Sequence, residues 1–163
     1  MPRLILGLVL LLAACTTQAP VPAGFRAADA PIWSAAAFQP AQAAGTWRQV
    51  AAFQPEAAVC RAGSVTLTPE AAGLRLDGTL CLAGTAQKVS GLAPVTGPGR
   101  IRVGGEEWWI LWVDTGYRTL AIGTPSGRFG LVLDRGAIPG DRLQAAREIF
   151  DFNGYRTAAL TPL

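Results

Sequence analysis

The chain has 163 residues, of which 50% are hydrophobic and 15% are charged, so it can form one domain with a hydrophobic core. Its 14 Lys and Arg residues outnumber its 11 Asp and Glu residues, but they occur singly, which argues against nucleic-acid binding. Histidine is absent, which excludes Ser-His-Asp and Cys-His catalysis and histidine-ligated zinc. We therefore expect a protein that is not an enzyme and has no metal or cofactor.

The first 15 residues are typical of an export signal. Arg3 precedes an apolar run, Leu4 to Leu12, that is too short to span a membrane as a mature helix. Leu12-Ala13-Ala14-Cys15 resembles the bacterial lipobox, in which residues 1–14 are removed and Cys15 is acylated. The alternative is an ordinary cleaved signal with an incidental cysteine.

Acyl chains on Cys15 would anchor the protein, at about 0.8 kcal/mol per buried CH₂. Thr16 stands where an inner-membrane retention signal has Asp, which favours the outer membrane, facing the periplasm. Residues 15–43 are rich in Ala and Pro and are predicted to be a flexible tether, with Ile32, Trp33 and Phe38 packing across one end of the domain. Residues 44–163 then form the folded domain.

From Thr46 onward the pattern is that of an all-β meander, barrel or sandwich, with alternating runs separated by Gly, Pro and Asp turns. Eight strands are predicted, over 46–53, 61–68, 73–82, 86–92, 99–104, 106–113, 117–124 and 127–135.

The second and third of these strands are predicted to form a hairpin around Pro69 to Ala72. Pairing Val65 with Leu76 separates an apolar face from a polar one, which supports that register. The same register places Cys60 opposite Cys81 on the polar face, so a cross-strand disulfide is expected in an exported protein. The alternative is two free thiols.

The strand 106–113 is apolar on both faces, so it needs a cover on both sides. A helix that begins at Pro139-Gly140-Asp141 and ends at Asn153-Gly154 supplies the outer cover. Its apolar stripe is Leu143, Ala146, Ile149 and Phe150. A short final strand is predicted from Tyr155 to Leu160.

Three short motifs in this order resemble those of the lipocalins: Gly45-Thr46-Trp47, Asp114-Thr115-Gly116-Tyr117-Arg118 and Arg135. The chain looks most similar to the bacterial outer-membrane lipoproteins related to apolipoprotein D. The resemblance implies an all-β fold, an eight-stranded antiparallel up-and-down barrel with one helix packed outside and a short final strand. It also implies that Gly45, Trp47, Asp114, Tyr117 and Arg135 close the barrel, with the Arg135 guanidinium stacked on Trp47.

The function that the resemblance implies is a membrane-anchored periplasmic lipocalin that binds or transports small hydrophobic ligands, such as fatty acids and lysophospholipids. Arg100 and Arg102 either meet a ligand head group or are solvated surface charges. The inward-facing set of the tryptophan-rich strand, and so its share of any ligand site, is left open: either Trp108, Ile110 and Trp112, or Trp109, Leu111 and Val113, with Tyr117 a further candidate from the next strand.

Residues 83–105 are poor in bulky apolar side chains, so the fourth and fifth strands are expected to be short and the cavity small or partly filled. The rival interpretation is therefore a structural or interaction lipoprotein of the cell envelope, with a filled barrel that docks on a protein partner.

Overall fold

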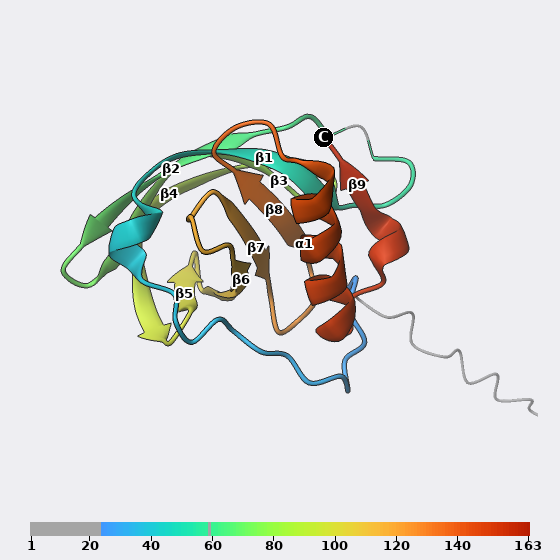
Figure 1. The fold of residues 1–163 in the computed structure, drawn as a ribbon, viewed down its shortest axis with the longest axis horizontal. Coiled ribbons are helices and arrows are strands. Elements are labelled where there is room, and N and C mark those ends of the chain that lie inside the picture. The colour runs from blue at the N-terminus through green and yellow to red at the C-terminus, as the bar shows by residue number, and fades with distance from the viewer. Residues whose placement is uncertain (1–23, 59) are drawn as a thin grey trace, which may run out of the picture.

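The structure is a computed structural model that describes residues 24–58 and 60–163. Nine strands form one sheet in the order β2-β3-β4-β5-β6-β7-β8-β1-β9, and pairing between β1 and β2 closes the first eight into an antiparallel up-and-down barrel (Figure 1). The one α-helix of the described residues, α1, lies outside this barrel against β6 and β7. The predicted fold class is confirmed. The predicted signal and lipidation site, residues 1–15, lie outside the described residues.

Most strand boundaries are close to those predicted. The elements are η1 (Pro40–Ala43), β1 (Gly45–Phe53), β2 (Ser64–Glu70), β3 (Gly73–Leu82), β4 (Thr85–Gly97), β5 (Arg100–Val103), β6 (Glu106–Val113), β7 (Thr119–Gly123), β8 (Gly130–Asp134), α1 (Gly140–Phe152), η2 (Thr157–Ala159) and β9 (Leu160–Pro162).

Two strands differ clearly from expectation. β4 has 13 residues, so the expectation of a short fourth strand is wrong; its backbone pairs with β3 without interruption from Leu82↔Thr85 to Gly73↔Pro94. Strand pairing uses backbone groups, so a strand of small residues can be long. The final strand begins at Leu160 and not at Tyr155, because a 3-10 turn comes first.

The β2–β3 hairpin has a different register from the predicted one. Leu67 faces Leu76 and Thr66 faces Asp77, around a tight turn at Ala71-Ala72. The predicted pairing of Val65 with Leu76 is therefore wrong, and Val65 faces Gly78 instead. This shift of two residues leaves the apolar and polar faces unchanged because side chains alternate with a period of two.

The predicted disulfide between Cys60 and Cys81 is confirmed, with 5.9 Å between the two Cα atoms. Cys60 lies before β2 rather than in it, and Cys81 is buried rather than on an exposed polar face. The buried Gln49 side chain on β1 holds the backbone of β3 at Cys81. Its Nε2 donates to the Cys81 carbonyl at 2.8 Å, and its Oε1 accepts from the Cys81 N–H at 2.7 Å.

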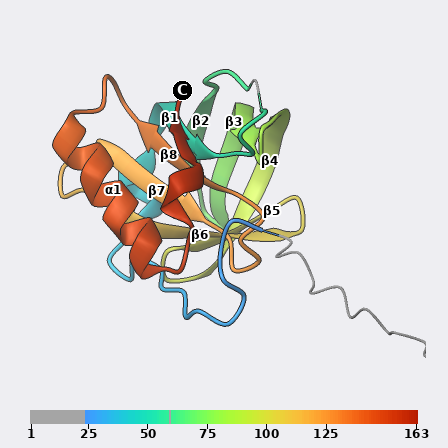
Figure 2. The same cartoon turned by 90° about the vertical axis from the view of Figure 1, so that its right-hand side faces the viewer.

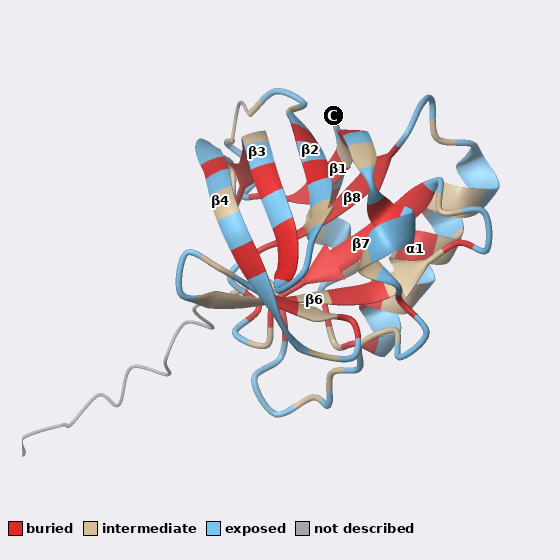
Figure 3. Ribbon diagram, turned by 90° about the vertical axis from the view of Figure 1, so that its left-hand side faces the viewer, coloured by how far each residue is buried: buried red, intermediate tan, exposed pale blue. Residues whose placement is uncertain are grey.

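Side chains of the strands largely fill the barrel interior. Burial alternates along β2 and along the middle of β3 (Figure 3), as expected of strands with one face in the core, whereas β3 ends in three buried residues. The interior cluster includes Trp47, Val65, Leu67, Leu74, Leu76, Leu80, Val89, Ile101, Trp108, Ile110, Leu120, Ile122, Leu131 and Leu133.

A second apolar cluster lies outside the barrel, between its wall and α1 (Figure 2). It contains Ala51, Phe53, Leu111, Ala121, Val132, Ala146, Phe150, Tyr155 and Leu160. The predicted apolar stripe of the helix faces this cluster, and the helix ends at Asn153, followed by Gly154 with φ +78°.

The tryptophan-rich strand β6 contributes to both clusters because its side chains alternate between the two faces, and a β-bulge reverses the alternation after Leu111. Its register against β7 shifts between Ile110 and Trp112. Trp108 and Ile110 therefore point into the barrel, Trp112 packs on the outer cluster, and Val113 packs on the inner one. Neither predicted inward set is correct, since both assumed strict alternation and a bulge adds one residue.

Residues 24–39 pack along the outside of the barrel, although the sequence suggested a flexible tether there. The Phe25 N–H donates to the Gly127 carbonyl, and the Ala35 N–H donates to the Ile110 carbonyl at 2.7 Å. The Gln39 N–H donates to the Tyr117 hydroxyl at the other end of the barrel.

Among the described residues, no helix is long and apolar enough to cross a membrane.

The Cys60–Cys81 bridge closes a separation of 21 residues. We predict that Cys60→Ser/Cys81→Ser lowers the free energy of unfolding by about 3 kcal/mol, because the unfolded chain gains loop entropy. Urea unfolding of the two proteins measures this. Mass spectrometry after alkylation checks the bridge itself: two alkylated thiols at these positions without prior reduction would contradict it.

Candidate functional site

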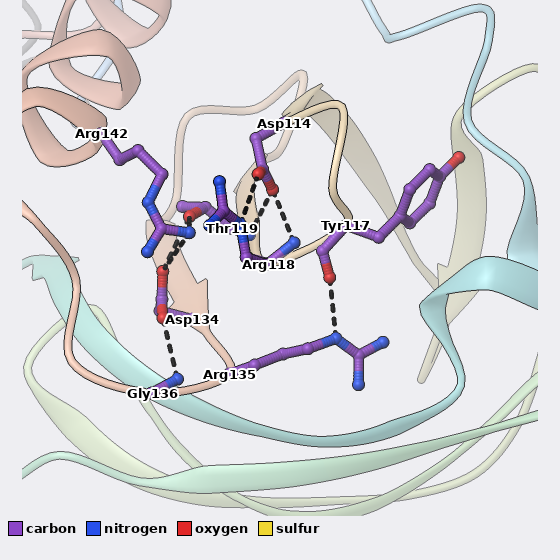
Figure 4. Close-up of polar contacts among 8 residues, drawn as sticks. All are labelled: Asp114, Tyr117, Arg118, Thr119, Asp134, Arg135, Gly136 and Arg142. Atoms are coloured by element: carbon purple, nitrogen blue, oxygen red, sulfur yellow. Dashed lines mark hydrogen bonds and ion pairs between the residues drawn. The ribbon is translucent and has the colours of Figure 1, made fainter.

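One end of the barrel is closed by η1 and by a set of contacts around Arg135, and we call it the closed end. The Arg135 guanidinium lies 4.2 Å from the centre of the Trp47 ring. It also donates to three carbonyls, those of Tyr117 at 2.7 Å, Ala44 at 2.8 Å and Gln42 at 3.1 Å. One side chain thus joins the segment around η1, β1, the β6–β7 turn and the end of β8. Figure 4 shows its bond to the Tyr117 carbonyl.

Trp47 and Gly45 fit this arrangement closely. Trp47 is fully buried, and its Nε1 donates to the Ala43 carbonyl at 2.9 Å, which fixes η1 over the barrel floor. Gly45 has φ +114°, and a Cβ there would lie 2.8 Å from Arg135 Nη1. Only glycine adopts this conformation readily and leaves the guanidinium room.

The β6–β7 turn is held by Asp114 and Tyr117. Asp114 Oδ1 accepts from the backbone N–H groups of Arg118 and Thr119, and its Oδ2 lies 3.3 Å from Arg118 Nε (Figure 4). Burial raises the pKa of the Asp114 carboxyl, but the hydrogen bonds outweigh burial, so the pKa is lowered from 3.8. Tyr117 adopts φ +49°, which aims its carbonyl at Arg135.

Sequence reasoning missed a neighbouring polar cluster that docks α1 on the barrel. Thr119 Oγ1 donates to Asp134 Oδ2 at 2.7 Å, and Arg142 Nη1 of α1 lies 3.3 Å from the same oxygen (Figure 4). The Gly136 N–H donates to the other Asp134 oxygen. Because Asp134 is buried, this paired arrangement is what makes its charge tolerable there.

The opposite end, which we call the mouth, lies at the turns β3–β4, β5–β6 and β7–β8. A cavity of about 460 Å³ opens there, lined by β4, the β5–β6 hairpin and the start of β8. Trp108 and Phe129 form its apolar floor, with ring centroids 5.0 Å apart in an edge-on contact. Both rings are buried, so they separate the cavity from the filled interior beneath.

Polar groups stand around this cavity. Lys88 and Arg128 line it together with Glu106, and Arg128 lies 3.2 Å from Glu106. Lys88 is exposed and has no ion-pair partner among the described residues. The mouth therefore combines an apolar floor with a net positive edge, which is the arrangement that suits an amphipathic molecule.

The Tyr155 side chain fixes the loop that forms one wall of the mouth. Its hydroxyl accepts from the Thr124 N–H at 2.7 Å and lies 3.0 Å from the carbonyls of Thr124 and Phe129. Burial raises the pKa of Tyr155, so the hydroxyl remains a donor at neutral pH.

Of the residues predicted for ligand contact, the structure brings only Trp108 to the mouth cavity. Ile110 is buried in the interior cluster, and Tyr117 lies at the closed end, stacked near Phe38. Trp112 lies on the outer wall. The cavity residues that sequence reasoning missed include Leu82, Gln87, Lys88, Val89, Arg128 and Phe129. Strand alternation would have indicated Val89 and Phe129 once the register was known.

Arg100 and Arg102 also lie away from this cavity. Arg100 sits 3.9 Å from the centre of the Trp109 ring and donates to Ser34 Oγ, so it fastens the N-terminal segment to the barrel wall. Arg102 is exposed and lies 2.6 Å from Glu107 Oε1. Among the described residues, no group of three or more Asp, Glu or Cys side chains could hold a metal ion.

No protein-family model matches the chain, and no curated protein matches its sequence. Among solved structures, apocrustacyanin C2 resembles it with a TM-score of 0.57 at 13% identity, over 87% of this chain and 88% of that one. Lobster apocrustacyanin A1 gives 0.55 at 13% identity, over 74% and 76%. H1 crustacyanin of the lobster Homarus americanus gives 0.54 at 16% identity, over 73% and 75%.

The chain has a lipocalin fold. At these low identities the likeness concerns the fold, and the bacterial branch suggested by the sequence stays a prediction. In this lipocalin fold, the motif residues gather at the closed end, and the cavity lies at the opposite end of the barrel.

We predict that Arg135→Lys lowers the free energy of unfolding by about 1–2 kcal/mol, because an ammonium keeps the charge but cannot reach three carbonyls and cover the Trp47 ring together. Chemical denaturation measures the change. Arg75→Lys, an exposed arginine paired with Glu70, is the control and should leave stability unchanged. Equal losses in the two variants would contradict the role of Arg135.

Asp114 should make the closed end sensitive to acid. Its folded-state pKa is lowered, so its stabilising effect is complete above pH 3.8 and is lost as pH falls below that value. We predict that Asp114→Asn lowers the free energy of unfolding by about 1–2 kcal/mol at pH 7. The difference in this free energy between the variant and the parent protein should become smaller below about pH 4. Urea unfolding from pH 7 to pH 3 tests this, and a difference independent of pH would refute it.

Proposed function

We propose that this protein is a membrane-anchored periplasmic lipocalin that binds small hydrophobic ligands at its mouth, with fatty acids and lysophospholipids as the ligand class. The observation that carries the proposal is the mouth cavity of about 460 Å³. Ligand pockets typically begin at about 300 Å³. The anchor and the periplasmic location rest on the lipobox-like sequence before Cys15, and placement at the outer membrane rests on Thr16.

The floor of the cavity decides how a ligand would lie. Trp108 and Phe129 close off the filled interior, so an acyl chain rests on these rings near the mouth and does not descend into the barrel. Lys88 can then pair with a carboxylate or phosphate head group at the edge. A ligand held this way keeps part of its surface outside the barrel, which suits transfer to and from a membrane.

Binding without chemistry agrees with the sequence, which lacks histidine. The rival proposal is an envelope lipoprotein that docks on a protein partner, and the filled interior favours it. The two differ in whether the mouth takes up lipid.

Displacement of a fluorescent fatty acid by lysophospholipid tests the proposal directly. We predict that Gln87→Trp, on β4 beside the cavity, weakens binding of both by about tenfold or more because the ring occupies the space of the ligand. Gln144→Trp, an equally exposed glutamine on α1, is the matched control and should bind as the parent does.

If the parent protein binds no member of a panel of fatty acids and lysophospholipids, the lipid-binding proposal fails and the docking role stands. If both tryptophan variants bind as well as the parent, the ligand lies elsewhere than at the mouth.

A further inference from the structure

A second hollow lies outside the barrel, on the wall opposite α1. It measures about 970 Å³ and lies over the outer faces of β1, β2 and β3, beside the β3–β4 turn. Small residues at its edges, Ala62, Gly63, Gly84 and Ala86, leave it open. The outward positions of β3 and β4 beside it are exposed in Figure 3.

The groove has a consistent chemistry. Its charged side chains are Arg48 and Arg61, and its lining contains no carboxylate. The hydroxyls of Thr46, Ser64, Thr79 and Thr85 line the space between and around them.

These two arginines differ from the other described ones. Every other arginine in residues 24–58 and 60–163 makes an ion pair or a side-chain hydrogen bond. Neither Arg48 nor Arg61 has an ion-pair partner there, and residues 1–23 contain no Asp or Glu that could supply one. Both exposed arginines that lack such a partner thus lie in the same groove.

The strand register places the groove residues in a row. Arg48 on β1 faces Ser64 on β2, and Ser64 faces Thr79 on β3. Directly paired residues share a face, and strands lie about 4.8 Å apart, so the row spans about 10 Å from Arg48 to Thr79. The row continues to Lys88 on β4, which also lines the mouth.

Two carboxylates on strands beside the groove, Asp134 and Asp77, do not neutralise its arginines. Asp134 faces Arg48 across β1 and β8, but its oxygens bind Thr119, Arg142 and Gly136. Asp77 on β3 faces Thr66 on β2. It is the outward-facing residue next to Thr79 in the direction of the closed end, and it does not line the groove. The positive charge of the groove is therefore available to a ligand.

We propose that this outer groove binds a phosphate-bearing ligand, with Arg48 and Arg61 as the charged donors. Each guanidinium offers five N–H donors, and each hydroxyl offers one. A single carboxylate has two acceptor oxygens and one negative charge, whereas a phosphate group has more acceptor oxygens and up to two charges and can accept from both guanidiniums and the hydroxyls between them. The ligand is either a soluble phosphate compound or the head group of an anionic phospholipid.

The test uses the full chain in two binding assays. Calorimetry measures binding of inorganic pyrophosphate, and sedimentation measures binding to vesicles of phosphatidylglycerol and phosphatidylcholine in a 1:3 ratio, with pure phosphatidylcholine vesicles as the reference for the N-terminal segment. Arg48→Gln/Arg61→Gln should weaken pyrophosphate binding by about tenfold or more at low salt. If the double variant also loses the phosphatidylglycerol-dependent binding to vesicles, the ligand is a lipid head group. If it loses pyrophosphate binding alone, the ligand is a soluble phosphate compound.

The control is the matched pair Arg61→Gln and Arg75→Gln, which remove the same charge from exposed arginines, the second already paired with Glu70. Arg61→Gln should weaken binding several-fold and Arg75→Gln less than twofold. Equal effects of the two substitutions would show a response to net charge and overturn the proposal. The proposal is also overturned if the parent protein binds neither pyrophosphate nor phosphatidylglycerol vesicles. An acidic protein surface would then be the ligand to test at this groove.

Discussion

The contact between Arg135 and Trp47 is the constraint on which the rest of the structure depends. A barrel of eight strands needs its first and last strands to meet, and here β1 joins both β2 and β8. Arg135, at the end of β8, lies over the Trp47 ring and binds carbonyls from the segment around η1 and the β6–β7 turn. One guanidinium thus ties together chain segments that are about 90 residues apart in sequence, 93 for its bond to Gln42.

The barrel is filled near its closed end and hollow at its mouth. Beneath Trp108 and Phe129 the interior is filled with aliphatic side chains and serves stability. Above these rings the mouth is hollow and carries polar groups. The motif residues that close the barrel and the cavity proposed for a ligand thus lie at different ends. The outer groove around Arg48 and Arg61 adds a third region on the barrel wall, which adjoins the mouth at Lys88.

The strand pattern was predictable because period-two alternation is a local property. The limits of β3 and β6 were predicted to the residue, and the helix was predicted from its turn signals and apolar stripe. Register and strand length were less accessible. The β2–β3 hairpin shifted by two residues because a shift of two keeps every side chain on its face, so polarity cannot distinguish the two alignments. The length of β4 was underestimated because its small residues give little hydrophobic alternation to detect. Its backbone nevertheless pairs with β3 without interruption.

The sequence by itself determined the class of fold and the residues gathered at the closed end, because each is encoded in local periodicity or in a short motif. It also determined the disulfide partners, because Cys60 and Cys81 are the two cysteines that follow Cys15. Only the tertiary structure decided which side chains line the two hollows. The bulge in β6 turned Trp112 outward, and neither the mouth cavity nor the outer groove has a sequence signature. Both hollows arise where strands distant in the chain come together, and their lining depends on register, which a local pattern does not specify.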